Sequence, residues 1–175
     1  MRGAATLRLL LLRHGQVDSN REYRYVGDRD ESLTELGRRQ AEQLAQALVA
    51  MPMSIERVVA SPRRRTVETA TALTERLDVP FSRDDRLAEQ SYGDWEGLSR
   101  AEVRERGADA AARLELFERD PAVRPPAGES LVEVQRRVVD LVRELDRQSA
   151  DSRVVALFSH VGPIKALRAR FSTCR

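Results

Sequence analysis

The stretch LRLLLLRHG, residues 7–15, decides the fold: a run of leucines ends abruptly in Arg-His-Gly. Two similar apolar runs follow, RVVA at 57–60 and RVVALFSH at 153–160. Near-continuous apolar runs between polar residues are typical of strands that are buried on both faces of a parallel sheet. These three runs therefore predict buried, parallel strands.

Helical patterns separate the predicted strands. Thr34 is suited to cap a helix that runs to about Ala50, and Ser130 forms a capping box with Glu133 at the start of another. Strand–helix alternation predicts an α/β fold, a three-layer sandwich with a mostly parallel central sheet and helices on both faces. The expected apolar stripe of the first helix is Leu36, Leu44, Ala47 and Leu48, and that of the second is Leu131, Val134, Val138, Leu141, Val142 and Leu145.

Residues 98–128 form a less regular stretch. Ser99 and Glu102 make another capping box, Gly107 is suited to end that helix, and three prolines precede Gly128. We expect a short helical insert over one end of the sheet. A pocket lid is favoured over a plain connection, because segments at this place often cover binding sites.

Composition limits the class of protein. The chain has 175 residues, with 30 basic and 28 acidic side chains, which predicts a single domain over residues 1–175. The single cysteine, Cys174, excludes an internal disulfide framework and a cysteine-built zinc site, and it favours a reducing, cytoplasmic setting. The leucine run is far shorter than the roughly 20 residues that span a bilayer, so no membrane partner is expected.

The pI of about 9.1 raises the question of a nucleic-acid partner. The net charge is only +2, the arginines are spread among acidic residues, and aromatic residues make up 5% of the chain. Nucleic-acid binding needs a clustered basic footprint and often stacking aromatics. We therefore expect no nucleic-acid partner.

A polar group follows each predicted strand. The chain's only two histidines, His14 and His160, come directly after the first and third strands. The second strand leads into Ser61-Pro62, which suits a helix N-cap and first turn, and then into the arginines 63–65. Ligands of open α/β sheets bind outside the carboxyl ends of the strands, where helix N-termini favour anions. Both histidines and an arginine cluster are therefore expected at one anion site.

Five ordered blocks resemble the histidine phosphatase superfamily, also called phosphoglycerate mutase-like. The resemblance extends from about residue 7 to residue 168. Its blocks are Leu12-Arg13-His14-Gly15-Gln16 through Asn20, Ser61-Pro62-x-x-Arg65-x-x-x-Thr69-Ala70, Leu87-x-Glu89 with Gly93-Asp94-Trp95-Glu96-Gly97, Gly128-Glu129-Ser130, and Ser159-His160.

The resemblance implies a role for each main site residue. His14 would be the nucleophile that takes the phosphoryl group, with its other ring nitrogen held by the Gly15 carbonyl. Arg13 and Arg65 would clamp the phosphate oxygens, since a planar guanidinium holds two oxygens and stays charged. His160 would donate to a phosphate oxygen.

Further residues complete the implied site. Glu89 stands at the general-acid position, where a carboxyl is useful only if its pKa is raised towards neutrality. Asn20 would add a neutral donor, and Gln16, Gly27 and Tyr92 are weaker candidates for phosphate or substrate contacts. Tyr92 and Trp95 are also expected to pack, Glu129 to serve its loop and the following cap, and Arg63 and Arg64 to face solvent.

Three features depart from the family pattern. Val17 stands where many members have Thr or Ser, which removes a hydroxyl near the phosphate. Arg63 stands where an apolar residue is common. Only 15 residues follow His160, fewer than is usual. Either the C-terminus is truncated, or a neighbouring chain covers the exposed sheet edge, and a homodimer is thus left open.

The function implied is a metal-independent phosphatase acting on a small phosphorylated metabolite through a phosphohistidine, without a metal or cofactor. Its surroundings are similar to small-metabolite members such as α-ribazole and sugar-phosphate phosphatases. The runner-up is a phosphoglycerate mutase, which passes the phosphoryl group to another hydroxyl; the compact stretch between Gly97 and Gly128 favours the phosphatase. A non-catalytic phosphate-binding protein on the same fold is the third alternative.

Overall fold

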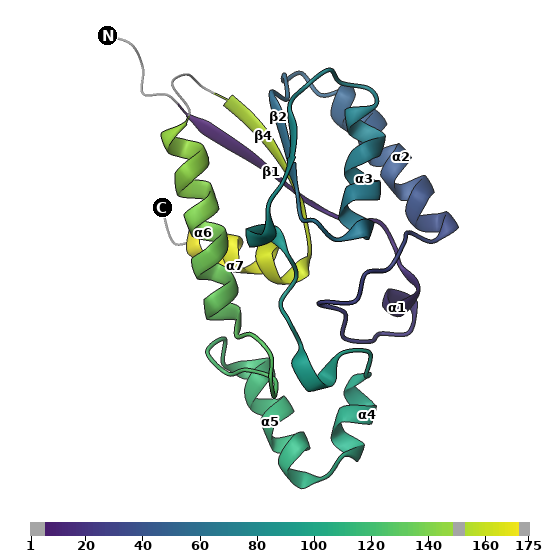
Figure 1. The fold of residues 1–175 in the computed structure, drawn as a ribbon, viewed down its shortest axis with the longest axis vertical. Helices are drawn as coiled ribbons and strands as arrows, with labels where there is room; N and C mark the ends of the chain where they lie inside the picture. The colour runs from purple at the N-terminus through teal and green to yellow at the C-terminus, as the bar shows by residue number, and fades with distance from the viewer. Residues whose placement is uncertain (1–5, 149–152, 172–175) are drawn as a thin grey trace.

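The computed structural model describes residues 6–148 and 153–171, and it has the predicted α/β architecture (Figure 1). Its sheet has the strand order β1-β4-β2-β3, and every neighbouring pair is parallel. The strands of the first and last parts of the chain are therefore side by side. The strands are β1 (Leu7–Arg13), β2 (Arg57–Ala60), β3 (Phe81–Arg83) and β4 (Arg153–Ser159).

Helices cover both faces of the sheet, as predicted. On one face lie α2 (Glu35–Val49) and α3 (Arg64–Thr74), and on the other lie α6 (Leu131–Arg147) and α7 (Val161–Phe171). The expected caps are present at Thr34, Ser99 and Ser130. The short elements are α1 (Asp18–Arg21), η1 (Asp85–Leu87), η2 (Gly93–Trp95), α4 (Arg100–Glu105) and α5 (Ala108–Arg119).

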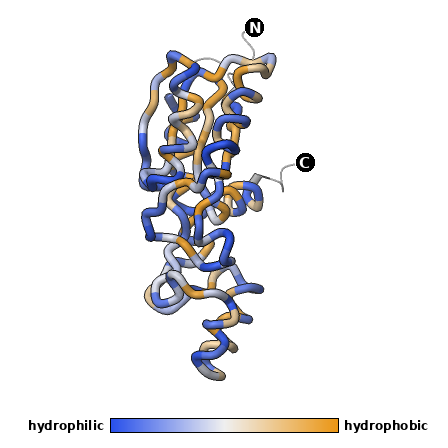
Figure 2. The backbone as a smooth tube through the Cα atoms, turned by 90° about the vertical axis from the view of Figure 1, so that its right-hand side faces the viewer, coloured by the Kyte–Doolittle hydropathy of each residue, from blue (hydrophilic) through white to orange (hydrophobic). Residues whose placement is uncertain are grey.

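Strands β1, β2 and β4 are mainly apolar because their successive side chains enter different cores. Val155 and Leu157 pack with α6 and α7, whereas Ala156 and Phe158 pack with α2 and α3. Burying each such large side chain contributes about 1.5–3 kcal/mol. In Figure 2 the strands run as apolar segments between helices that carry hydrophilic stretches.

Two details of the helix and strand predictions are wrong. Leu36 and Ala47 are exposed, because α2 packs through its smaller residues Ala41 and Ala45, together with Leu48. Gly37 allows α2 to lie close to the loop after β1, since a Cβ at position 37 would lie 2.2 Å from the Gln16 carbonyl oxygen. The strand β3 was not predicted, because its three residues are too few to show a period.

The insert at residues 98–128 consists of α4, α5 and a proline-rich loop. It extends beyond the carboxyl end of the sheet (Figure 1) and packs through Val103 and Leu114 against the buried Trp95. Tyr25 and Tyr92 also border this small core, with ring centroids 4.7 Å apart. The packing roles expected of Trp95 and Tyr92 are therefore confirmed.

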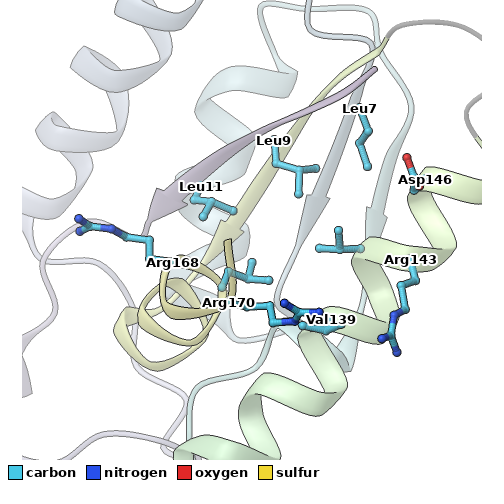
Figure 3. Close-up of a pocket in the computed structure, with 10 residues that line it drawn as sticks. Leu7, Leu9, Leu11, Val139, Arg143, Asp146, Arg168 and Arg170 are labelled. Carbon is cyan, nitrogen blue, oxygen red and sulfur yellow. The ribbon is translucent and has the colours of Figure 1, made fainter. Parts of the chain in front are cut away.

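Strand β1 lies at one edge of the sheet and borders an apolar groove of about 580 Å³. Figure 3 shows Leu7, Leu9 and Leu11 directed from β1 towards α6 and α7, with Arg143 and Arg168 at the rim. Within the described ranges, none of the helices combines the length and the apolar character that a membrane span requires.

Candidate active site

The two histidines lie side by side at the carboxyl ends of neighbouring strands. His14 follows β1 and His160 follows β4, and the backbone N–H of His14 donates to the Ser159 carbonyl at 3.2 Å. Their ring centroids are 5.1 Å apart, at an interplanar angle of 60°. The sheet order thus brings together two residues that are far apart in the sequence.

The ring of His14 is held in one tautomer. Its Nδ1 lies 2.7 Å from the Gly15 carbonyl oxygen, the predicted partner. Because a carbonyl only accepts, the contact assigns the proton to Nδ1 and a lone pair to Nε2. Burial, with the positive charges of Arg65 and Arg13, lowers the pKa of His14 to about 3, although the Gly15 contact raises it. The ring is therefore uncharged at neutral pH, as a nucleophile must be.

The two predicted clamp arginines have different environments. Arg13 is exposed at the rim, whereas Arg65 is 1% exposed. The Arg65 guanidinium donates to the carbonyls of Arg29 at 2.6 Å and Gly27 at 3.0 Å, so the loop after α1 fixes its plane. Gly27 therefore contacts Arg65 through its carbonyl, and its own N–H donates to the Glu96 carboxylate.

His160 is fully buried between Arg65 and Ser61. Arg65 Nε donates to its Nδ1 at 3.3 Å, so Nδ1 carries a lone pair, and the Nε2 proton faces Ser61 Oγ at 2.8 Å. Burial lowers its pKa well below the ordinary value, and the neighbouring Arg65 charge lowers it further. The expected donation from His160 to phosphate therefore requires the Nε2 proton to turn from Ser61 Oγ to the phosphate, or a second proton at Nδ1.

The helix α3 begins later than the N-cap predicted at Ser61. The N-cap is Arg63, and α3 begins at Arg64. The Ser61 hydroxyl contacts His160 Nε2 at 2.8 Å and also accepts from the N–H of the N-cap residue Arg63 at 3.4 Å. Arg63 is not turned to solvent as expected, because it is only 28% exposed and its Nη2 pairs with Asp28.

Glu89 is buried at the N-terminus of α7. Its Oε1 accepts from the backbone N–H groups of Gln90 and Gly162 at 2.9 Å each, and its Oε2 accepts from Val161 at 3.1 Å. Burial raises its pKa above the ordinary value, although these N–H groups and Arg65 lower it. Glycine at position 162 leaves room for this carboxylate, since a Cβ there would lie 2.4 Å from Glu89 Oε1 and would displace it.

A pocket of about 400 Å³ adjoins His14. Asn20 and Gln16 line it, as expected of binding residues, but Tyr92 does not; Gln16 Oε1 accepts from the Thr34 hydroxyl. Its full lining is Arg13, His14, Gly15, Gln16, Asn20, Gln40, Ala41, Leu44 and Thr69.

Thr69 has a positioning role that the sequence motif did not explain. Its hydroxyl accepts from the Gly15 N–H at 3.0 Å and donates to the Arg65 carbonyl at 2.7 Å. One buried hydroxyl thus connects the His14 loop to the first turn of α3. The only sequence signal was its place in the block Ser61 to Ala70.

Both buried histidines should make stability depend on pH. Because their pKa values in the folded chain lie below 6.5, the unfolded chain binds more protons in mild acid. The stabilisation is complete above pH 6.5 and is lost as the pH falls towards the folded-state pKa, about 3 for His14. Each histidine contributes a slope of up to roughly 1.4 kcal/mol per pH unit.

Urea unfolding at pH 7.5, 6 and 5 checks this expectation. The free energy of unfolding of the unmodified chain should fall more steeply below pH 6.5 than that of His14→Asn. Equal slopes in the two proteins would contradict a buried, uncharged His14.

Comparison with known proteins agrees with this arrangement. An all-parallel sheet with two histidines at the ends of neighbouring strands defines an α/β protein of phosphoglycerate mutase-like fold. The model of the histidine phosphatase superfamily (branch 1) matches residues 9–174, and the chain belongs to this family. The resemblance of its motifs is therefore confirmed.

The relatives include named phosphatases. The chain is 40% identical over 168 residues to a glucosyl-3-phosphoglycerate phosphatase of Mycolicibacterium vanbaalenii, covering 93% of this chain and 72% of that protein. It is also 40% identical over 168 residues to the bifunctional protein Rv2228c of Mycobacterium tuberculosis. That match covers 95% of this chain, which spans only 44% of the relative's length.

Solved structures of a relative contain phosphate-like anions. The mycobacterial glucosyl-3-phosphoglycerate phosphatase Rv2419c in complex with VO3 has a TM-score of 0.84 and 38% identity, covering 93% of this chain and 79% of that chain. The same protein has been solved with inorganic phosphate.

Proposed function

We propose that the protein is a metal-independent phosphomonoesterase that works through a phosphohistidine at His14. The observation that carries this proposal is the contact between His14 Nδ1 and the Gly15 carbonyl, which leaves a lone pair on Nε2 in an uncharged ring. Arg65 and Arg13 supply the positive charge that a transferring phosphoryl group needs.

The reaction has two steps in this proposal. Nε2 of His14 attacks phosphorus, the N–P bond forms, and the bond from phosphorus to the ester oxygen breaks while Glu89 gives that oxygen a proton. Water then attacks phosphorus as Glu89 takes back a proton, the N–P bond breaks, and phosphate leaves. The raised pKa of Glu89 supports this use as acid and then base.

A second pocket borders the Glu89 side of the site. It has a volume of about 290 Å³ and is lined by Gln90 and Gly162, both of which contact the Glu89 carboxylate. Its charged lining residues are the cations Arg100, Arg119 and Lys165 and the carboxylates Glu118 and Asp120, and Arg100 pairs with Glu118 at 2.8 Å. This mixed polar lining, with Tyr92 at its wall, supports a polar alcohol as the leaving group. The names of the relatives support glucosyl-3-phosphoglycerate or a similar phosphorylated hydroxy acid as the substrate.

A phosphate-release assay in EDTA tests the proposed function. The panel should contain glucosyl-3-phosphoglycerate, 3-phosphoglycerate, phosphoserine and an aryl phosphate. We expect free phosphate from the aryl ester and fastest release from a carboxylated alkyl ester. Conversion of 3-phosphoglycerate to 2-phosphoglycerate without phosphate release would favour the mutase, and saturable phosphate binding without any turnover would favour the binding protein.

Location and oligomeric state belong to the same proposal. The cysteine count supports a reducing, cytoplasmic compartment. Among the described residues no strand pairs with the outer edge of β1, which supports a homodimer in which a second copy covers that edge.

A further inference from the structure

The guanidinium of Arg137, on α6, uses all five of its N–H groups. Nη1 donates to the carbonyls of Arg86 at 2.7 Å and Ala88 at 2.8 Å, and Nη2 donates to the carbonyl of Glu89 at 3.1 Å. Nε and Nη2 each donate to the Glu129 carboxylate at 2.9 Å. Five donors in one plane thus have five acceptors, which is the full capacity of the group.

These contacts converge on the backbone that carries Glu89. The carbonyl of Leu87, the one in this run that Arg137 does not bind, accepts from the Ser159 hydroxyl at 2.7 Å. Four consecutive carbonyls, from 86 to 89, are therefore fixed by side chains. Arg86 adds a further connection, because its own guanidinium pairs with Glu144 on α6 at 2.9 Å.

Glu89 is consequently held from two sides. Arg137 fixes its main chain, and the N-terminus of α7 binds its carboxylate. A proton donor must lie within hydrogen-bond reach of the leaving oxygen, and a displacement of about 1 Å can cost on the order of 100-fold in rate. The main-chain contacts fix the position of the Glu89 backbone, and with it the position from which the carboxyl side chain extends.

Glu129 balances the charge of this group. Its carboxylate forms a two-contact pair with Arg137, instead of the loop and capping role expected from the sequence, while the cap of α6 is formed by Ser130 and Glu133. The Arg137–Glu129 pair is close to neutral as a unit. Its effect on Glu89 is therefore mainly geometric.

We propose that Arg137 is a positioning residue for the general acid Glu89, a role that rests on the proposed phosphatase function. Lysine has three donors on one atom and cannot reproduce the planar five-contact pattern. Losing Arg137 should free the carbonyls of Ala88 and Glu89, while the Arg86–Glu144 pair and the Ser159 contact with Leu87 remain. The proton transfer from Glu89 to the leaving oxygen should be slower, while the rate of attack by His14 should be unchanged.

Two esters separate these effects. An alkyl monoester, the one hydrolysed fastest in the panel above, needs a proton on its leaving oxygen, whereas 2,4-dinitrophenyl phosphate does not. The kcat/KM value reports on steps up to phosphohistidine formation. We expect Arg137→Met to lower kcat/KM for the alkyl ester by about 30- to 100-fold and for the dinitrophenyl ester by less than about 5-fold.

Two variants complete the design. Arg136→Met removes the same charge from an exposed neighbour on α6 and should leave both values unchanged. Arg137→Lys should show the same selective loss, in a smaller degree, and serves if Arg137→Met does not fold. In a Glu89→Gln background, Arg137→Met should add little further loss for the alkyl ester.

The outcomes test the positioning role of Arg137 separately from the proposed phosphatase function. Equal losses for both esters in Arg137→Met, or in Arg137→Lys where only that variant folds, overturn the positioning role and leave the phosphatase intact. Full additivity with Glu89→Gln also overturns it. An unmodified chain that hydrolyses neither ester overturns the proposed function and this role with it.

Discussion

Replacing His14 with asparagine should lower kcat/KM for every ester by about 10⁴-fold or more, because it removes the imidazole that we propose takes the phosphoryl group. The unmodified chain, quenched during turnover of a ³²P-labelled ester, should carry an acid-labile, base-stable label. The variant should carry none. Asparagine is small and uncharged, so it suits the buried position.

The matched control for this result is His160→Asn. It removes the other buried histidine, and it should slow turnover while retaining the label, because His14 is still present. A label in His14→Asn that is lost in His160→Asn would reverse the assignment of the nucleophile.

Replacing Glu89 with glutamine should produce the second large effect. Glutamine cannot give up a proton, so kcat/KM for an alkyl ester should fall by roughly 10²- to 10⁴-fold, and that for 2,4-dinitrophenyl phosphate by much less. The amide NH2 would also face the N–H groups of Val161 or Gly162, so some loss of thermal stability is expected. Glu115→Gln, at an exposed position on α5, is the control and should behave as the unmodified chain does.

The pH profile gives an independent check on Glu89. Because burial raises its pKa above the ordinary value, the acid form persists to higher pH than in a solvated glutamate. The alkyl-ester kcat/KM should decline as the pH rises through this raised pKa, and Glu89→Gln should lose that decline. A decline that persists in the variant would assign it to another group.

Much of the fold could be predicted because its signals are local. Near-continuous apolar runs mark strands that are buried on both faces, and Ser or Thr before a helical pattern marks a cap, as at Thr34 and Ser130. The exposed face of α2 could not be predicted in the same way. Leu36 is exposed because close packing of α2 selects Ala41 and Ala45, which is a property of two elements and not of one.

Some residues of the candidate site could likewise be predicted from the sequence, and others could not. Strand ends and motif spacing lead to His14, His160 and Glu89, since these follow from topology and resemblance. Among the partners that hold them in place, Thr69 is marked only by its motif block, and Arg137 has no local signal. The contacts of Thr69 with Gly15 and of Arg137 with Glu89 join segments that are distant in the sequence.

The strand order also has a consequence for biosynthesis. In the described part of the chain β1 pairs with one strand, β4, which the ribosome makes after the other strands of the described sheet. Its leucine-rich segment therefore emerges long before its hydrogen-bonding partner exists, and it adds high contact order to the fold. Apolar segments that stay unpaired during synthesis are prone to aggregate, so we expect this segment to be the part of the nascent chain at greatest risk. Because β1 and β4 also deliver His14 and His160, phosphoryl chemistry can begin only after this late pairing.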